Sequence, residues 1–492
     1  MNIADLLGEQ HALRPDAPAV IRGGETVGYA ALDDWVWRTA AALRDRGVTP
    51  GEVVATHFVD ELHGLVATLA LARVGASVFT LAVSDPALAR EREAASVGAA
   101  RLLTDDAGAH AAGLAPCVVD LDAIRSGTAP VDASVRADAP AAPWLILTGS
   151  GSTGRPKRMH LHHRTTFERN AVQRDAMPIA PGERVLCMAS VEFGLTKQRY
   201  VEAIAFGATV VMYDRATEGP LAVCRAHSVD VLHASVFHVE SLLARVPADR
   251  VRVLEGLRVL RIGSSFVSDS LKQRAMRTLT PNVYVIYALN ELGIASVARP
   301  EDFTPGRTRP GSVGRPPSLI ELQVVDAQGE PVPDGTVGLI RVRGPGLVDG
   351  YAGDPEASAS AFRGGWFYPG DLGVRSPQGD LVFSGRADQM MILDGINIYP
   401  SEIENALMSH PAVRDAAAFP LASELHHQVP VCVVVLDDAA GVDANSLRQW
   451  ARERLGARAP RRVIRVAEIP RNESGKLQRA ELARVLGAAS GG

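Results

Sequence analysis

The stretch Leu147-Thr148-Gly149-Ser150-Gly151-Ser152-Thr153-Gly154-Arg155-Pro156-Lys157 guides the interpretation of the whole chain. It follows a short apolar run at 141–146 that predicts a buried strand, so we expect a loop at the end of a sheet. Its three glycines allow backbone conformations closed to other residues, and its hydroxyls and lysine supply hydrogen-bond donors. These features predict an anion-binding loop, and phosphate is the anion that suits it best.

Two well-known phosphate-binding motifs fit the glycines of this loop by spacing. Gly149, Gly151 and Gly154 match the G-x-G-x-x-G of a dinucleotide fold, and Gly149 to Gly154 have the glycine spacing of a nucleoside-triphosphatase loop. The triphosphatase loop needs Lys and then Ser or Thr directly after its last glycine, where this chain has Arg155-Pro156. Both motifs continue into a helix, and a proline disfavours helical geometry at the residue before it. A plain glycine- and serine-rich surface turn is the remaining alternative.

Length and composition limit the class of protein. A chain of 492 residues is too long for one hydrophobic core and predicts two or more domains. A hydrophobic fraction of 47% and a charged fraction of 22% are ordinary for a soluble globular protein. The formal net charge of -5 gives no electrostatic reason to expect nucleic acid or an anionic membrane as a partner.

The cysteines and the apolar segments indicate a cytoplasmic protein. Cys117, Cys187, Cys224 and Cys432 form no C-x-x-C pair, which argues against a zinc site or a disulfide framework and fits a reducing compartment. The first residues are acidic and lead into no apolar run, so we expect no signal peptide. The most apolar helical stretch, 62–74, contains charged residues and is too short to cross a bilayer.

Helical and strand patterns alternate through the first half of the chain. Helical apolar spacing at 31–46 and 62–75 alternates with strand-like runs at 53–56 and 76–81, and further strand-like runs lie at 185–190, 207–212 and 229–235. Strands that alternate with helices predict parallel pairing and an α/β fold. The segment 125–142, rich in Ala, Pro, Asp and Ser, is expected to connect elements across the surface.

Five segments with polar or glycine-rich motifs follow in order. They are Tyr287-Ala288-Leu289-Asn290-Glu291, Gly365-Trp366-Phe367-Tyr368-Pro369-Gly370-Asp371, Ser384-Gly385-Arg386-Ala387-Asp388, Gly395-Ile396-Asn397-Ile398-Tyr399-Pro400-Ser401-Glu402-Ile403-Glu404 and Pro470-Arg471-Asn472-Glu473-Ser474-Gly475-Lys476-Leu477-Gln478-Arg479. With the Thr-Gly-x-Pro-Lys of the glycine loop, they resemble the motifs of the adenylate-forming acid ligases. That superfamily contains acyl-CoA synthetases, peptide-synthetase adenylation domains and luciferases.

The resemblance implies a fold and a reaction. The fold would be a large multi-sheet N-terminal domain, 1–387, with parallel βα layers and a small β-rich subdomain, followed by a small mobile α+β C-terminal domain, 388–492. The enzyme would use ATP and Mg²⁺ to convert a carboxylic acid into an acyl-adenylate, and would then transfer the acyl group to a pantetheine thiol. The small domain would rotate about the hinge residue Asp388 between these two steps.

The resemblance also implies which residues form the ATP site. Lys476, Glu291 and His162 would be catalytic, and Glu291 with Thr153 would hold the metal. Asp371 would accept hydrogen bonds from both ribose hydroxyls, for which its two oxygens suit it. The nucleotide contacts would come from Thr148, Ser150, Gly151, Ser152, Thr153, Gly154, Lys157, Gly263, Ser264, Ser265, Tyr287, Asn290, Asp371 and Arg386.

Polar residues lie where the acid would bind. The expected acid pocket contains Glu192, Phe193, Lys197, His233 and Ser235, with Phe193 as a possible gate. Such a pocket is too polar for a long-chain fatty acid, so an amino acid, a hydroxylated aryl acid and a short polar acid stay open. The acceptor is either coenzyme A, which the sequence motif around Pro400 favours, or phosphopantetheine on an acyl or peptidyl carrier protein.

The chain departs from the family's sequence motifs at Arg158, Asn290, Pro369 and Ile392, where relatives usually have Gly, Thr, Thr and Lys. Arg158 would either change the mobility of the glycine loop or add a cation near the phosphates. Two other classes stay open. They are an NAD-dependent oxidoreductase, if the glycine loop were a dinucleotide site, and a non-catalytic nucleotide-binding homologue. A metal site at His160 and His162 lacks an apparent third ligand.

Overall fold

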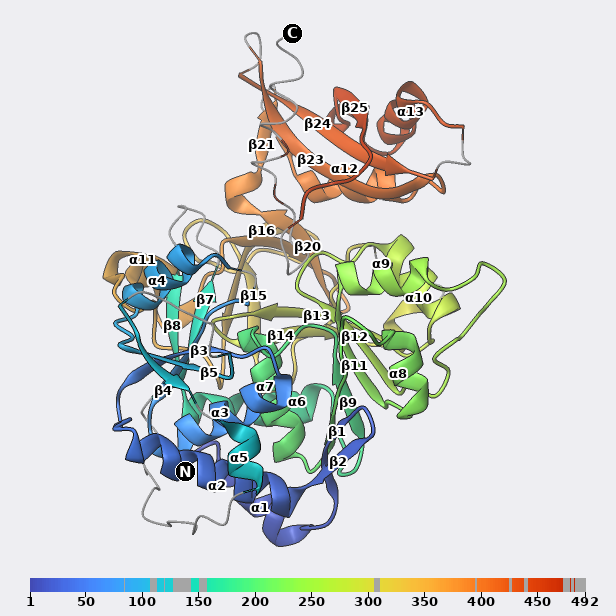
Figure 1. The fold of residues 1–492 in the computed structure, drawn as a ribbon. Helices are drawn as coiled ribbons and strands as arrows, with labels where there is room; N and C mark the ends of the chain where they lie inside the picture. The colour runs from blue at the N-terminus through green and yellow to red at the C-terminus, as the bar shows by residue number, and fades with distance from the viewer. Residues whose placement is uncertain are drawn as a thin grey trace.

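The computed structural model describes residues 1–83, 85–106, 113–118, 120–126, 143–149, 157–304, 310–393, 396–423, 427–437, 441–471, 478 and 482. Figure 1 shows two parts of unequal size. The larger part runs from α1 (Asp5–Leu13) to β20 (Leu381–Arg386), and the smaller part runs from β21 (Met391–Leu393) to β25 (Arg462–Arg465).

The first sheet of the large part has eight strands, and its six inner strands are parallel. β13 pairs antiparallel with β14 at one edge, and β1 pairs antiparallel with β2 at the other. Parallel strands have their carboxyl ends at one edge of a sheet, which is where ligands bind in such folds. The strand order is β14 (Gly293–Ala298), β13 (Val283–Leu289), β12 (Val259–Gly263), β11 (Val231–Ser235), β9 (Arg184–Cys187), β10 (Thr209–Met212), β1 (Pro18–Arg22) and β2 (Glu25–Gly28).

The second sheet carries the glycine loop at one edge. Its order is β6 (Ala115–Val118), β5 (Arg101–Thr104), β3 (Val53–His57), β4 (Ser77–Thr80), β7 (Pro143–Gly149) and β8 (Lys157–His162). All pairs are parallel except β7 with β8, which form an antiparallel hairpin with Thr148 opposite Arg158. The glycine loop therefore connects the two strands of an edge hairpin.

Helices join the two sheets into one core. α7 (Gly194–Ala205) contacts β7 of the second sheet and both β9 and β10 of the first. A Cβ added at Gly194 would lie 2.4 Å from Leu147 Cδ2, so a side chain where α7 begins would displace the Leu147 side chain. The other helices of the large part are α2 (Tyr29–Asp45), α3 (Glu61–Val74), α4 (Ala87–Ser96), α5 (Leu121–Ser126), α6 (His163–Ala176), α8 (Pro220–Ala226), α9 (Val236–Ala244), α10 (Asp269–Thr278) and α11 (Pro355–Ala361).

A third, antiparallel sheet covers the end of the large part next to the small one (Figure 1). Gly314 makes the turn into it with φ of +74°, and a Cβ at this position would lie 1.9 Å from the carbonyl oxygen of Val297. No other residue type fits there without moving the backbone. The strands are β15 (Glu321–Val325), β16 (Val337–Arg343), β17 (Phe362–Arg363), β18 (Trp366–Phe367), β19 (Asp371–Arg375) and β20.

The small part has its own hydrophobic core. It contains α12 (Pro400–Met408), α13 (Ala444–Leu455), the pair of β21 with β22 (Ile396–Ile398), and a sheet of β23 (Val413–Ser423), β24 (His427–Leu436) and β25. The core of the large part ends at Leu381, and that of the small part begins at Met391. These limits support our proposed domain boundary between residues 387 and 388.

The predicted α/β fold class is confirmed by the parallel sheets and by the match to adenylate-forming enzyme folds reported below. The strands expected at 53–56 and 229–235 correspond to β3 and β11, whereas the one expected at 185–190 already ends at Cys187. The antiparallel edge strand β14 was not expected. Most of the predicted connector 125–142 lies outside the described residues. None of the described helices is both long and apolar enough to cross a membrane.

Candidate active site

The base of the glycine loop is described, but its tip is not. Thr148 and Lys157 lie in the β7–β8 hairpin. Two sets of predicted site residues lie outside the described residues: Ser150, Gly151, Ser152, Thr153 and Gly154 of the loop, and Lys476 near the end of the chain.

Lys157 and Glu291 are linked through a tyrosine that the sequence analysis did not select. The Lys157 ammonium lies 4.4 Å from the centre of the Tyr351 ring, and the Tyr351 hydroxyl donates to Glu291 Oε1 at 2.9 Å. Burial, and then the negative charge of Glu291, raise the pKa of Tyr351, so its hydroxyl stays protonated and can donate. Glu291 therefore lies beside the base of the glycine loop, with one carboxylate oxygen committed to Tyr351.

A second chain of contacts joins three predicted residues on β13, β19 and β20 to Asp388, which lies just after β20. The Tyr287 hydroxyl donates to Asp371 Oδ2 at 2.5 Å, and Arg386 Nη1 donates to Asp371 Oδ1 at 3.3 Å. Arg386 also makes a two-pronged ion pair with the expected hinge residue Asp388, at 3.2 and 3.1 Å. The residue expected to bind ribose is thus connected to the expected pivot through one guanidinium.

Burial dominates the electrostatics of Asp371, which is only 6% exposed. Burial raises the pKa of this carboxyl, while the hydrogen bond from Tyr287 and the charge of Arg386 act in the opposite direction. The pKa of Tyr287 is raised well above its usual value, first by burial and then by Asp371. Tyr287 is therefore a donor to Asp371 across the physiological pH range.

Three of the expected nucleotide contacts, Gly263, Ser264 and Ser265, lie at the end of β12. Gly263 ends the strand, and Ser264 has φ of +73°, a left-handed conformation that is uncommon for a residue with a side chain. The Phe383 ring lies next to it, stacked on Phe266 at 6.4 Å and tilted against Tyr287 at 5.9 Å. Phe383, like Tyr351, was not selected from the sequence.

Asn290 and His162 are both connected to helix α6. The Asn290 carbonyl accepts from Arg169 Nη2 at 2.9 Å, while the residue itself is exposed at the start of the β13–β14 turn. His162 precedes α6, and its Nε2 lies 3.6 Å from Asp349 Oδ2. Among the described residues no group of three or more His, Cys, Asp or Glu side chains could hold a metal, so a metal site at His160 and His162 gains no support.

The residues expected to line the acid pocket differ in their surroundings. Glu192 accepts from Ser190 Oγ and from the Val83 backbone N–H, both at 2.8 Å, and Phe193 is half-buried directly before α7. Lys197 is buried and donates to the Val191 carbonyl; burial lowers its pKa to about 7.

The other two candidates for the acid pocket, His233 and Ser235, lie on β11. Ser235 caps the start of α9. The imidazole of His233 is buried, and neither ring nitrogen has a hydrogen-bond partner among the described residues.

Arg158 contacts α4 and the neighbouring strand of its own hairpin. Its guanidinium pairs with Glu93 of α4, donates to Thr148 Oγ1 and, at 3.1 Å, to Ser96 Oγ, and lies 4.8 Å from the centre of the Phe79 ring. Of the two sequence-based expectations, these contacts favour an effect on the loop hairpin over an added cation at the phosphates.

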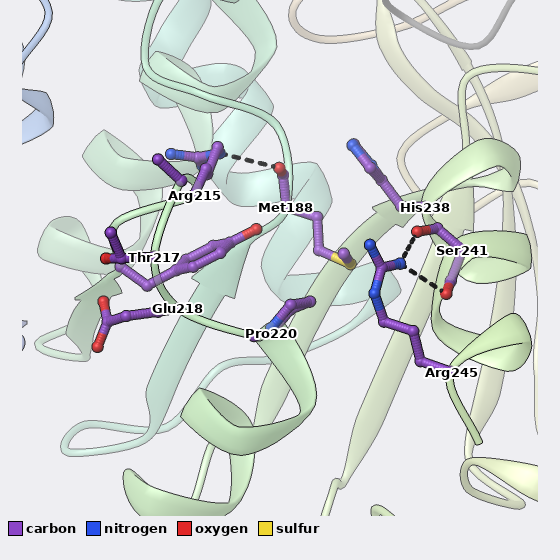
Figure 2. Close-up of a pocket in the computed structure, with 11 residues that line it drawn as sticks. Met188, Arg215, Thr217, Glu218, Pro220, His238, Ser241 and Arg245 are labelled. Atoms are coloured by element: carbon purple, nitrogen blue, oxygen red, sulfur yellow. Dashed lines mark hydrogen bonds between the residues drawn. The ribbon is translucent and has the colours of Figure 1, made fainter. Parts of the chain in front are cut away.

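A separate cavity of about 420 Å³ lies between the segment that follows β10 and helix α9 (Figure 2). Arg245 donates to the Ser241 carbonyl at 2.8 Å on one side, and Arg215 donates to the Met188 carbonyl at 3.3 Å on the other. Arg215 is also paired with Glu61, so its charge is compensated. None of the predicted site residues lines this cavity.

Family models decide the identity of the chain. One described as AMP-binding enzyme matches residues 7–352, and one described as AMP-binding enzyme C-terminal domain matches residues 402–476. The chain belongs to the family of AMP-binding enzymes. Enzymes of this family use ATP and acceptors of the coenzyme A type, so the predicted class, an AMP-forming acid–thiol ligase, is confirmed.

Three similar proteins show the range of this family. The feruloyl-CoA synthase of Amycolatopsis sp. is 30% identical over 495 residues, which cover 96% of this chain and 97% of that protein. The probable nonribosomal peptide synthetase CymA of Salinispora arenicola is 32% identical over 96% of this chain, but that match covers 6% of the synthetase. The crystal structure of ATP-bound MatB from Rhodopseudomonas palustris has the same fold, with a TM-score of 0.87, 23% identity and 99% coverage of each chain.

Proposed function

We propose that this AMP-binding enzyme joins a small carboxylic acid to coenzyme A, with ATP converted to AMP and pyrophosphate. The observation that carries the proposal is the arrangement at the carboxyl end of β13. There, the Lys157–Tyr351–Glu291 contacts meet the Tyr287–Asp371–Arg386 contacts, which bring together side chains from five separate segments. An uncommon backbone conformation at Ser264 lies beside them.

These residues fit the parts of ATP. Asp371 can accept hydrogen bonds from the ribose hydroxyls because it is buried and held in place by Tyr287 and Arg386. Lys157, at the base of the glycine loop, would bind a phosphate oxygen. The second oxygen of Glu291, which accepts no hydrogen bond from any described residue, would hold Mg²⁺, and Thr153 would contribute to the same site. The metal would neutralise charge on the phosphates.

In the first step, a carboxylate oxygen of the acid attacks the α-phosphorus of ATP, and the bond to pyrophosphate breaks. Two anions must approach each other, so positive charge and N–H donors at the phosphates lower the barrier. We assign this role to Lys157, the loop donors and Lys476. His162 would help to shape the site on the acid side. In the second step the thiol attacks the acyl carbon, loses its proton and expels AMP.

Coenzyme A is the acceptor we favour. The feruloyl-CoA synthase, which matches over nearly its whole length, supports this choice and also an aromatic acid as substrate. A phosphopantetheinylated carrier protein is the second candidate, because the chain also matches one segment of the peptide synthetase CymA.

The proposal predicts acid-dependent exchange of labelled pyrophosphate into ATP. We expect exchange with at least one acid of a panel of aryl, amino and short polar acids. Lys476→Ala should slow it by roughly 10²–10³, the usual effect of removing one group that stabilises transition-state charge. Arg452→Ala, an exposed position on α13 of the same small part, is the control and should leave the exchange unchanged.

Absence of exchange with every acid would contradict the proposal. For an acid that is active, adding coenzyme A or a phosphopantetheinylated carrier protein and detecting the thioester by mass spectrometry distinguishes the two acceptors.

A further inference from the structure

A cluster of buried charged and polar side chains lies between the first sheet and helices α6 and α7. All of its members are at most 9% exposed. They are Arg169, Gln173, Gln198, Arg199, Glu202, His233 and Arg261.

Positive charge is in excess in this cluster. Arg199 pairs with Glu202, and Arg199 and Arg261 both donate to Gln173 Oε1, at 3.1 and 3.0 Å. Among the described residues, Arg169 donates only to neutral acceptors, namely Gln198 Oε1 and the Gly346 and Asn290 carbonyls. Within the described part of the chain, Glu202 is the only carboxylate at ion-pair distance from these three arginines.

Such an excess is costly, because a buried charge without a counter-charge loses its hydration and gains little in return. Burial, followed by repulsion from Arg199, lowers the pKa of Arg261 to about 9 against the opposing charge of Glu202. The same two causes lower the pKa of Arg169 against the opposing charge of Glu291. The pKa of His233 is also lowered, by burial first and then by Arg261 and Arg199. His233 is therefore neutral at pH 7 and can donate one hydrogen bond, for which it has no acceptor among the described residues.

Strand register places the cluster directly beneath the proposed acid-binding edge. His233 of β11 is opposite Arg261 of β12, and two residues further along the same face Ser235 is opposite Gly263. Gly263 has no side chain to cover Arg261, and Ser235 is small. Within the cluster, His233 and Arg261 thus lie two residues, about 7 Å, below the carboxyl edge of the strands.

We propose that the acid substrate carries a second anionic group, a carboxylate or a phenolate, at the end opposite the reacting carboxylate. This group would lie against Arg261, Arg199 and His233, while the reacting carboxylate stays near Asn290. This inference rests on the proposed function and specifies its substrate class. The second anion would supply the missing counter-charge and an acceptor for His233, and it would not take part in any bond change.

The test compares pairs of acids of similar shape in the pyrophosphate exchange assay. Suitable pairs are terephthalate with 4-methylbenzoate, 4-carboxycinnamate with 4-methylcinnamate, and adipate with heptanoate. In the wild-type enzyme we expect kcat/KM to be roughly 10- to 100-fold higher for the doubly charged member of at least one pair, as for a hydrogen-bonded charge out of water. In Arg261→Met the ratio should fall to near one.

Arg261 is the right position because it donates to the neutral Gln173, and Glu202 keeps its ion pair with Arg199 when Arg261 is removed. Arg258→Met is the matched control. Arg258 lies just before the opposite end of β12, is paired with the partly buried Glu183, and should leave the ratio unchanged. Thermal unfolding shows whether each variant is folded.

Equal or higher kcat/KM for the singly charged acids in the wild-type enzyme would overturn this inference and leave the proposed function intact. A preference that persists in folded Arg261→Met would also overturn it. Absence of exchange with every acid would overturn the proposed function, and this inference with it.

Discussion

Asp371 illustrates how single residues adjust a binding group. Its carboxylate is buried between β13 and β20, and its charge depends on the Tyr287 hydroxyl and the Arg386 guanidinium. An uncharged Asp371 would present only one good acceptor oxygen, so ribose binding through both hydroxyls requires the ionised form.

Tyr287→Phe should weaken ATP binding and move its pH dependence. Hydrogen bonds to charged groups contribute about 1.5–3 kcal/mol, so kcat/KM for ATP should fall roughly 10- to 100-fold. Loss of this donor raises the pKa of Asp371 further above its usual value, because the hydrogen bond from Tyr287 lowers it. Since activity falls as pH drops through that pKa, the acidic limb of the pH profile should move to higher pH. Tyr284→Phe on the same strand is the control, and a limb at the same pH in Tyr287→Phe would contradict this role.

At the level of elements, the β7–β8 hairpin is held by Arg158, a residue that departs from the family motif. Arg158 connects this hairpin to α4 through Glu93 and Ser96, and it also donates to Thr148 on the neighbouring strand. Arg158 therefore connects the strands on both sides of the glycine loop to helix α4.

Arg158→Met should loosen this attachment. We expect the free energy of unfolding to fall by about 1–2 kcal/mol, a modest loss because Glu93 is partly exposed and can be hydrated. The KM for ATP should rise while the KM for the acid changes little. Denaturant unfolding and exchange kinetics measure the two effects. In Arg164→Met, which removes an exposed pair with Glu168 on α6, the stability loss should stay below about 0.5 kcal/mol; equal losses in both variants would contradict the attachment.

The sequence predicted elements better than it predicted contacts between them. Alternating helical and strand patterns are local, and they correctly indicated parallel sheets and the strands β3 and β11. Tyr351 and Glu291 are 60 residues apart, and Arg169 and Asn290 are 121 apart, so no local pattern could pair them. A signal for the cationic cluster was nevertheless present, because Arg261 interrupts an otherwise apolar strand. The direction of Arg158 followed only from packing against α4.

At the scale of the whole molecule, the described residues of the two parts make polar contacts near the expected hinge. Ser401 Oγ at the start of α12 donates to the Ser384 carbonyl of β20 at 2.5 Å, and Asp388 is paired with Arg386. Polar contacts permit a rotation of one part against the other, because each contact can be exchanged for one with water.

Asp388→Pro should therefore separate the two half-reactions. A proline fixes φ at about -65° and removes the ion pair with Arg386, so the small part should be held near one orientation. We expect either pyrophosphate exchange or thioester formation to persist at close to its wild-type rate, while the other falls at least about tenfold. Asp388→Ala removes the same ion pair without fixing φ, so it should retain both half-reactions and shows how much of the effect comes from the lost charge. If Asp388→Pro changed both rates by the same factor, rotation about residue 388 would not separate the two steps, and the pivot would have to lie elsewhere between β20 and β21.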